Sequence, residues 1–187
     1  TRRSSDLLFV ALAPKIAPDQ PGLLYEGHNY SLLGSASNYV LVMTYEWGYT
    51  YGPPMAVAPI NSVRRVLDYA ITEIPSNKIF MGIPNYGYDW PLPFIQGETK
   101  ATSISNYEAV NIAAQFGAEI MFDTEAQSPT FMYDNGQMHE VWFEDARSIQ
   151  TKLLTAHEYG FKGISYWNLM RYFPQNWLVL NSLFNIN

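Results

Sequence analysis

The sequence predicts an α/β fold built around a mainly parallel sheet. Short apolar runs typical of strands recur at residues 7–12, 39–44, 79–83 and 163–166, and a loop or a helical pattern separates each from the next. The run at 39–44 is almost uninterrupted, as expected of a strand that is buried on both faces. Strands alternating with loops or helices give the order of a parallel sheet.

Three helices are expected against this sheet. The first lies between Pro59 and Pro75, which suit the start and the stop of a helix. Its apolar residues recur at helical spacing: Val63, Val66, Leu67, Ala70 and Ile71. Asp145 is a favourable N-cap for a second helix that ends near Gly160. A closing helix begins near residue 175, with apolar residues again at helical spacing.

The alternation stops after Trp90 and predicts a small insertion. Ser105 and Glu108 have the spacing of a capping box for a helix that ends at Gly117. Short strands follow, and the Asp-Asn-Gly sequence at 134–136 predicts a hairpin turn. We therefore expect an α+β insertion at 91–139 within a main domain made of 1–90 and 140–187.

Composition excludes several classes of partner. The 187 residues carry a net charge of −6, with 15% charged and 48% hydrophobic residues. This balance argues against binding to nucleic acid or anionic lipid, which requires basic surface. No apolar run reaches the length of a membrane span. Residues 1–6 lead almost at once into a strand, so the start of the protein is expected upstream.

Aromatic residues form 16% of the chain, with 14 Tyr and 5 Trp, which suits either an ordinary packed core or a carbohydrate cleft. They gather with polar residues at three strand ends, 44–47, 85–90 and 166–168, which a parallel sheet would bring to one edge. Glu46 at the first end could be a catalytic acid, an acceptor for substrate hydroxyls or half of an ion pair. Asp89 could share the same mouth, whereas residues 144–145 better suit a helix cap.

Metal and nucleotide chemistry find little support. The three histidines are scattered and none has a zinc-binding spacing: His28, His139 and His157. The sequence has no P-loop, no GxGxxG fingerprint and no GxSxG elbow. No cofactor is expected.

At these strand ends the chain resembles family 18 glycoside hydrolases, the chitinase-like (β/α)8 TIM barrels. Residues 43–46 match their Met-x-Tyr-Asp/Glu signature, 82–87 their Gly-x-Pro-x-Tyr-Gly signature, and 163–167 a strand that ends in a subsite tryptophan. Residues 127–129, 141–145 and 173–177 resemble the bacterial spore-germination branch, which usually carries LysM domains and acts on peptidoglycan. The resemblance implies an enzyme of the spore or cell wall, outside the cytoplasm.

One family motif is missing. The Asp-x-x-Asp-x-Asp-x-Glu sequence of barrel strand four, which ends in the general acid, is absent from these 187 residues. By resemblance the chain supplies roughly strands five to eight, with the insertion between strands seven and eight. The expected partner is therefore an N-terminal half of the barrel, possibly preceded by LysM domains, and the 187 residues alone are expected to be inactive.

The resemblance also implies a substrate-assisted, retaining mechanism on N-acetylglucosamine-containing glycans such as peptidoglycan or chitin oligomers. Tyr45 would hydrogen-bond the acetamido oxygen of the substrate, Trp167 would lie under the sugar, and Glu46 would accept hydrogen bonds or orient the acetamido-binding group. The other predicted contacts with the glycan are Met43, Trp47, Tyr86, Asp89 and Trp90. Two alternatives remain, a non-catalytic glycan-binding barrel and a two-carboxylate glycosidase that uses Glu46 with Asp89 or Glu144.

Overall fold

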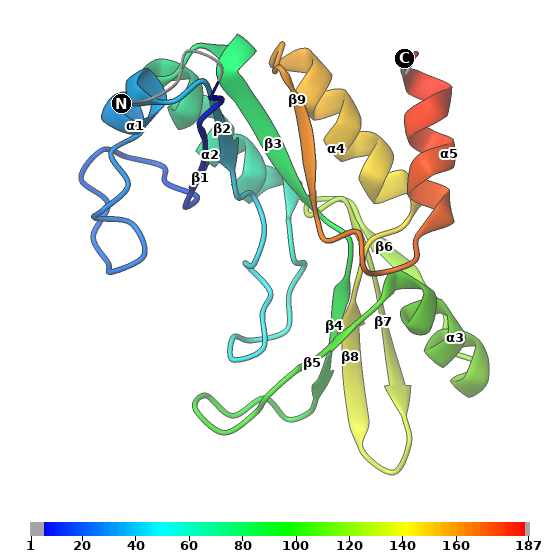
Figure 1. The fold of residues 1–187 in the computed structure, drawn as a ribbon. Coiled ribbons are helices and arrows are strands. Elements are labelled where there is room, and N and C mark those ends of the chain that lie inside the picture. The colour runs from blue at the N-terminus through cyan, green and yellow to red at the C-terminus, as the bar shows by residue number, and fades with distance from the viewer. Residues whose placement is uncertain (1–5, 186–187) are drawn as a thin grey trace.

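The computed structural model describes residues 6–185, so residues 1–5, which precede the first predicted strand, lie outside the described part of the chain. A parallel sheet forms the upper lobe in Figure 1. Its strands are β1 (Phe9–Leu12), β2 (Tyr39–Val42), β3 (Ile79–Pro84) and β9 (Gly163–Trp167), in the order β1-β2-β3-β9. All three pairings are parallel, which confirms the predicted α/β class.

Four helices accompany this sheet: α1 (Tyr30–Ala36), α2 (Ile60–Glu73), α4 (Ala146–Glu158) and α5 (Pro174–Leu183). The last three were expected, and Asp145 caps α4 by accepting from the backbone N–H of Arg147 at 2.9 Å and Ser148 at 3.0 Å. Helix α1 was not expected from the sequence. It begins after Asn29, whose side chain accepts from the N–H of Leu32.

The two faces of the parallel sheet differ in burial. Val40 and Val42 of β2 and Ile79 of β3 are fully buried in a core shared with α1 and α2. The other face carries three aromatic rings that touch one another across the strands: Phe9, Tyr39 and Phe80, with centroids 5.0 to 6.2 Å apart. Phe9 is 47% exposed. Helices therefore cover one face, and the second face is left partly open.

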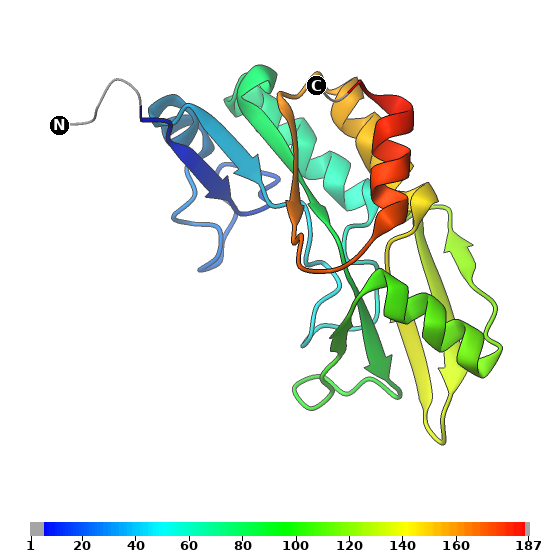
Figure 2. The same ribbon diagram turned by 45° about the vertical axis from the view of Figure 1, so that its right-hand side comes forward.

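A second, antiparallel sheet forms the lower lobe, and it is set at an angle to the first (Figure 2). Its strands are β4 (Gly87–Pro91), β5 (Thr102–Ile104), β6 (Met121–Asp123), β7 (Ser128–Asp134) and β8 (Met138–Trp142), in the order β5-β4-β8-β7-β6. The helix α3 (Asn106–Phe116) begins with the predicted capping box, and the predicted turn joins β7 to β8. A short 3-10 helix, Ser76–Lys78, precedes β3.

This lobe is larger than the insertion expected at 91–139. The antiparallel sheet begins at Gly87 and ends at Trp142, so the predicted strand end at 85–90 is partly a strand of the second sheet. Only Asn85 and Tyr86 separate β3 from β4. The loop after β2 packs against this lobe, because Gly52 accepts from the indole N–H of Trp90 and Thr50 accepts from the backbone N–H of Ala101, both at 2.8 Å.

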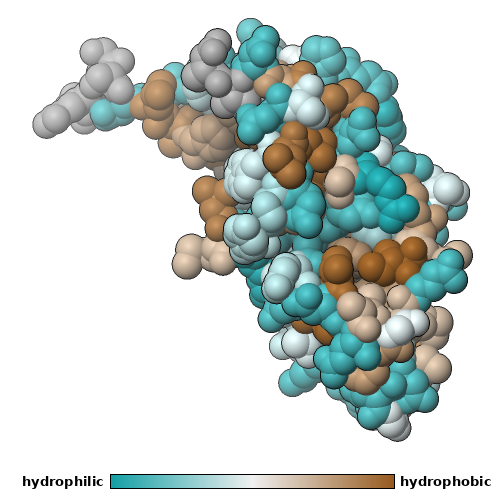
Figure 3. All heavy atoms as spheres, turned by 90° about the vertical axis from the view of Figure 1, so that its right-hand side faces the viewer, coloured by the Kyte–Doolittle hydropathy of each residue, from teal (hydrophilic) through white to brown (hydrophobic). Residues whose placement is uncertain are grey.

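Within residues 6–185, no helix combines the length and the apolar character that crossing a membrane requires. The face that carries α3 and α5 shows separate hydrophobic patches within a mostly hydrophilic surface (Figure 3).

Candidate active site

The carboxyl ends of β2, β3 and β9 lie side by side, as the parallel sheet predicts. The hydroxyl of Thr44 donates to the backbone oxygen of Gly82 at 2.6 Å and links the first end to the second. The backbone N–H of Asn85 donates to the oxygen of Trp167 at 2.8 Å and links the second end to the third. These two bonds fix the relative positions of the residues that follow each strand.

Tyr45 follows β2 and packs its ring against the backbone of Gly82 in β3. The ring is 9% exposed, and burial, followed by the nearby charge of Glu46, raises the pKa of the phenol. Its hydroxyl is therefore a proton donor over the whole physiological range. The pocket beside it, of about 200 Å³, is lined by Pro14, Leu24, Tyr25, Met43, Tyr45, Glu46 and Trp47.

Glu46 has an unusual backbone. Its φ of 71° lies in the left-handed region, which residues other than glycine rarely adopt. The side chain is exposed, and its carboxylate accepts hydrogen bonds from the phenols of Tyr86 and Tyr88, the latter at 3.1 Å. Backbone conformations of this kind cost free energy and occur often at functional sites, where surrounding contacts maintain them.

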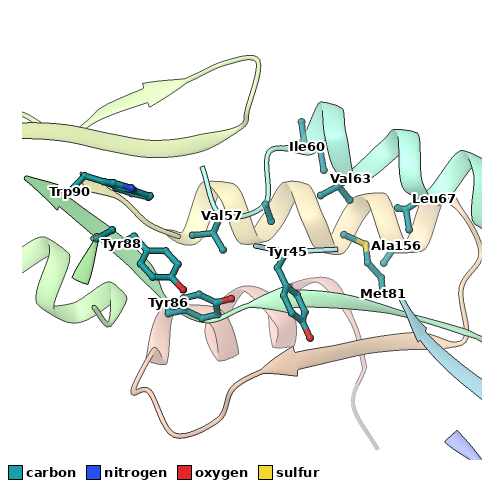
Figure 4. Close-up of a cluster of buried hydrophobic side chains, with 12 residues drawn as sticks. Tyr45, Val57, Ile60, Val63, Leu67, Met81, Tyr86, Tyr88, Trp90 and Ala156 are labelled. Atoms are coloured by element: carbon teal, nitrogen blue, oxygen red, sulfur yellow. The ribbon is translucent and has the colours of Figure 1, made fainter. Parts of the chain in front are cut away.

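Tyr86 and Tyr88 support this carboxylate from the junction between the two sheets. Figure 4 shows their rings in a row with those of Tyr45 and Trp90. The Tyr86 and Tyr88 rings meet edge to face with centroids 5.8 Å apart, and Trp90 follows at 5.6 Å. Burial first, then the carboxylate of Glu46, raises the pKa of Tyr86 far above its usual value and that of Tyr88 to about 12. Both phenols therefore stay protonated and donate to Glu46.

A second pocket, of about 180 Å³, also has Glu46 in its lining. Tyr86, Tyr88 and Glu46 line it together with Trp167, which is 57% exposed. Ser103 on β5 and the segment after β9, Asn168 and Arg171, complete the lining. The peptide bond between Trp167 and Asn168 is cis. Glu46 thus lines two pockets, one that includes Tyr45 and one that includes Trp167.

Five of the predicted contact residues line these pockets together with Tyr45: Met43, Glu46, Trp47, Tyr86 and Trp167. Asp89 and Trp90 do not. The carboxylate of Asp89 accepts from the phenol of Tyr133 at 2.7 Å and lies 2.7 Å from Nδ1 of His139, within the antiparallel sheet. Trp90 is fully buried in the core.

Glu144, the other carboxylate considered from the sequence, is also engaged elsewhere. Its Oε2 lies 2.8 Å from Nζ of Lys152, and both side chains are fully buried. Ser103 and Arg171 were not predicted as site residues. Each comes to the pocket through tertiary contacts that span 68 positions of the sequence, so only their closeness to the strand ends in the fold reveals them.

A metal site is absent from the described chain: no three His, Asp or Glu side chains within residues 6–185 are placed to hold an ion. His28 accepts from the backbone N–H of Ala13 at 3.0 Å, and His139 pairs with Asp89. The polar and aromatic side chains that line the two pockets include phenols, indoles, one carboxylate and one guanidinium.

Sequence and structure comparisons agree on the family. Residues 2–171 match the profile described as "Glycosyl hydrolases family 18". The chain belongs to glycosyl hydrolases family 18. The resemblance inferred from the three strand-end motifs is thereby confirmed.

Several relatives support the assignment. The "Cortical fragment-lytic enzyme" of Bacillus subtilis (strain 168) is 52% identical over 181 residues, which are 96% of this chain and 42% of that protein. The structure of the Bacillus cereus spore cortex-lytic enzyme SleL superposes with a TM-score of 0.94 at 46% identity and covers 98% of this chain and 43% of that one. A chitinase of Chromobacterium violaceum matches with a TM-score of 0.84 at 28% identity, over 92% of this chain and 54% of that one. The chain thus spans less than half the length of its spore-enzyme relatives.

Proposed function

We propose that this chain forms part of the catalytic domain of a glycosidase that hydrolyses β-1,4 bonds in N-acetylglucosamine-containing glycans, with spore cortex peptidoglycan as the main substrate. The arrangement that carries the proposal is the pair of pockets that share Glu46, one with Tyr45 and one with Trp167. The names of the spore cortex-lytic relatives support the substrate. A site of action in the spore cortex or cell wall, outside the cytoplasm, is part of this proposal and is supported by the names of the same relatives.

In the proposed mechanism the substrate provides its own nucleophile, as in the substrate-assisted mechanism of this family. The acetamido oxygen attacks the anomeric carbon, the glycosidic bond breaks as its oxygen takes a proton from the general acid, and an oxazolinium ion forms. Water then opens this ion with retention. Tyr45 donates its phenolic hydrogen to the acetamido group, for which its raised pKa suits it.

The other site residues hold the sugar in this geometry. The exposed face of Trp167 provides an apolar surface for the ring. Glu46, held by Tyr86 and Tyr88, accepts hydrogen bonds from sugar hydroxyls or from the acetamido N–H. Met43 and Trp47 shape the pocket on the side of Tyr45. Asp89 is proposed to stabilise the antiparallel sheet through Tyr133 and His139 and not to contact the glycan.

The general acid is proposed to lie on a preceding segment that also completes the barrel. The parallel sheet has two outer strands, β1 and β9, whose outer edges pair with no other described strand. Its face with Phe9, Tyr39 and Phe80 is partly open, whereas parallel sheets are normally covered on both faces. Four more strands, equivalent to strands one to four of a (β/α)8 barrel, would pair with the two outer edges and cover the open face. LysM domains, which bind glycan, are proposed as further upstream partners.

A non-catalytic glycan-binding barrel is the alternative, and the residue at the end of strand four decides between the two. A Glu there supports the enzyme, and a residue such as Leu or Gln supports the binding protein. The two-carboxylate scheme with Asp89 or Glu144 is disfavoured, because both carboxylates are buried and paired away from the pockets.

The experiment uses full-length protein incubated with cortex fragments and with chitin oligomers, and it measures new reducing ends and the anomer released. We expect cleavage of at least one substrate, with the β-anomer formed first. Binding of either glycan without new reducing ends would favour the alternative. The absence of both binding and cleavage would overturn the proposal.

A further inference from the structure

We propose that Arg171 forms a subsite for a carboxylate carried by the glycan and so directs the site toward acidic substrates. This inference rests on the proposed function. It concerns the pocket that Glu46 and Trp167 line together, in which Arg171 provides the single cationic side chain among the lining residues. A neutral chitin-like chain offers this guanidinium no anionic partner, whereas a peptidoglycan chain carries carboxylates on its lactyl groups or its peptides.

The position of Arg171 is fixed at both ends of the residue. Its backbone oxygen accepts from the side-chain amide of Asn85 at 3.2 Å, and Asn85 itself is buried at the end of β3. Its Nη2 donates to the hydroxyl of Ser103 at 3.2 Å and lies 3.4 Å from the Ser103 backbone oxygen. A guanidinium held in this way loses little further conformational entropy when it binds a ligand.

Arg171 also keeps binding capacity. A guanidinium has five N–H donors, and the hydrogen bonds to Ser103 use only those of Nη2. Nη1 lies 3.7 Å from the carboxylate of Glu108, a long contact to a side chain that is 59% exposed. A pair this long, with one partner exposed, contributes little, so Glu108 can be exchanged for a better partner. An incoming carboxylate can therefore take up the remaining donors in a bidentate arrangement.

Charge is separated across this pocket. Glu46 and Arg171 both line it, and Tyr88 lies within range of both charges, since Glu46 raises and Arg171 lowers the pKa of its phenol. Sugar hydroxyls donate to the Glu46 side, and a carboxylate is attracted to the Arg171 side. Trp167, beside Asn168 in the same lining, supplies the apolar surface for a sugar ring. A sugar that carries hydroxyls and one carboxylate matches the carboxylate, the guanidinium and the indole in this lining.

The test compares three oligosaccharides of equal length: a neutral N-acetylglucosamine oligomer, an alternating oligomer with free lactyl carboxylates, and the same alternating oligomer with attached peptides. Full-length wild type, Arg171→Gln, Arg171→Lys and the control Arg65→Gln are assayed for kcat and KM. Arg65 is exposed on α2, so its variant loses the same charge outside the pocket. The two acidic substrates distinguish a carboxylate on the sugar from one on the peptide.

We expect Arg171→Gln to lower kcat/KM by about tenfold to hundredfold on at least one acidic oligomer, mainly through KM, because a charge-assisted hydrogen bond is lost. The loss of kcat/KM on the neutral oligomer should be smaller, because that oligomer carries no carboxylate. On the acidic oligomers, the kcat/KM of Arg171→Lys should lie between those of wild type and Arg171→Gln, since lysine keeps the charge without the planar guanidinium. Added salt should reduce the wild-type preference for acidic substrates.

Equal losses on all three oligomers would overturn the proposal and would assign Arg171 only to holding the segment after β9 against Ser103. If wild type cleaves none of them, the proposed function fails, and binding of the same oligomers is then measured directly. Stronger binding of acidic oligomers that Arg171→Gln abolishes would still support the subsite. Equal binding of the acidic and the neutral oligomers would overturn the proposed subsite.

Discussion

The ring of Tyr45 occupies the space that a side chain at Gly82 would need. A Cβ added to Gly82 would lie 2.8 Å from Cε1 of Tyr45 and 2.8 Å from the backbone oxygen of Val42. Both distances are shorter than a van der Waals contact, and one partner is backbone. The first glycine of the Gly-x-Pro-x-Tyr-Gly signature is thus explained by the phenol ring of Tyr45, which follows the neighbouring strand and packs over it.

Gly82→Ala is therefore expected to displace Tyr45 and to destabilise the fold. Overpacking of this kind costs about 1–3 kcal/mol, which outweighs the gain of about 0.4–1 kcal/mol from a less flexible unfolded chain. Urea denaturation and glycan hydrolysis by the full-length protein measure both effects. Gly27→Ala is the control, because nothing lies within 4 Å of its added Cβ. Equal stabilities of the two variants would contradict the steric account.

Tyr45→Phe tests the hydroxyl without changing the ring. The ring keeps its packing against Gly82, so the free energy of unfolding should stay near that of wild type. Loss of a donor that acts on the acetamido group in the transition state should lower kcat by about 10²–10³, with KM little changed. Steady-state kinetics on a chitin oligomer provide the measurement. A raised KM at constant kcat would instead assign the hydroxyl to ground-state binding.

The phenols around Glu46 predict a specific loss of stability at alkaline pH. The pKa of Tyr88 rises from 10.0 to about 12 in the folded protein, through burial first and the charge of Glu46 second. The folded state therefore holds this proton more tightly, so its contribution to stability is complete below pH 10 and is lost as the pH rises toward 12. Glu46→Gln removes the part of this rise that depends on charge and leaves the larger part due to burial, so the decline should be shallower.

Urea midpoints measured across this pH range provide the comparison. Glu119→Gln is the matched control, because Glu119 is exposed and removal of its charge leaves the phenols unchanged. If both variants lose stability with the same slope as wild type, Glu46 does not set the titration of these phenols.

Much of this arrangement could be predicted from local sequence. The β2, β3 and β9 strands, the capping box of α3 and the Asp145 cap of α4 each depend on neighbouring residues, and each was expected. The meeting of Tyr45 and Trp167 at one edge follows from the direction of parallel strands. Helix α1 was missed because its seven residues are too few to show a helical period.

Contacts across the fold could not be predicted in the same way. Tyr88 and Asp89 were expected at a strand end, yet they belong to β4, whose partners β5 and β8 lie farther along the chain. The pairing of Asp89 with His139 spans 50 positions, and that of Arg171 with Ser103 spans 68. No local pattern indicates such partners, so the residues after Tyr86 could not be divided from the sequence into those that line the pocket and those that belong to the second sheet.

Asp89→Asn separates a structural role from glycan binding. The carboxylate accepts from Tyr133 and pairs with His139 inside the second sheet. Hydrogen bonds to charged groups contribute about 1.5–3 kcal/mol, so the variant should unfold more easily while the KM for neutral glycans stays constant. Thermal unfolding and kinetics below the transition measure the two effects. A raised KM with unchanged stability would restore Asp89 as a glycan contact.

Lys152→Met tests the buried ion pair that joins α4 to the segment after β8. Removal of the ammonium leaves Glu144 buried without its cation, which typically costs 3–5 kcal/mol. Burial already raises the pKa of Glu144, and loss of Lys152 raises it further, so the folded variant favours the protonated acid. Its destabilisation should thus be smallest below the usual glutamate pKa of 4.5 and should grow as the pH rises.

Urea denaturation at several pH values measures this pH dependence. Arg64→Met is the control, because it breaks a solvent-exposed pair with Glu158 and should change stability little. A pH-independent loss in Lys152→Met would mean that packing of the lysine stem, and not its charge, holds α4 in place.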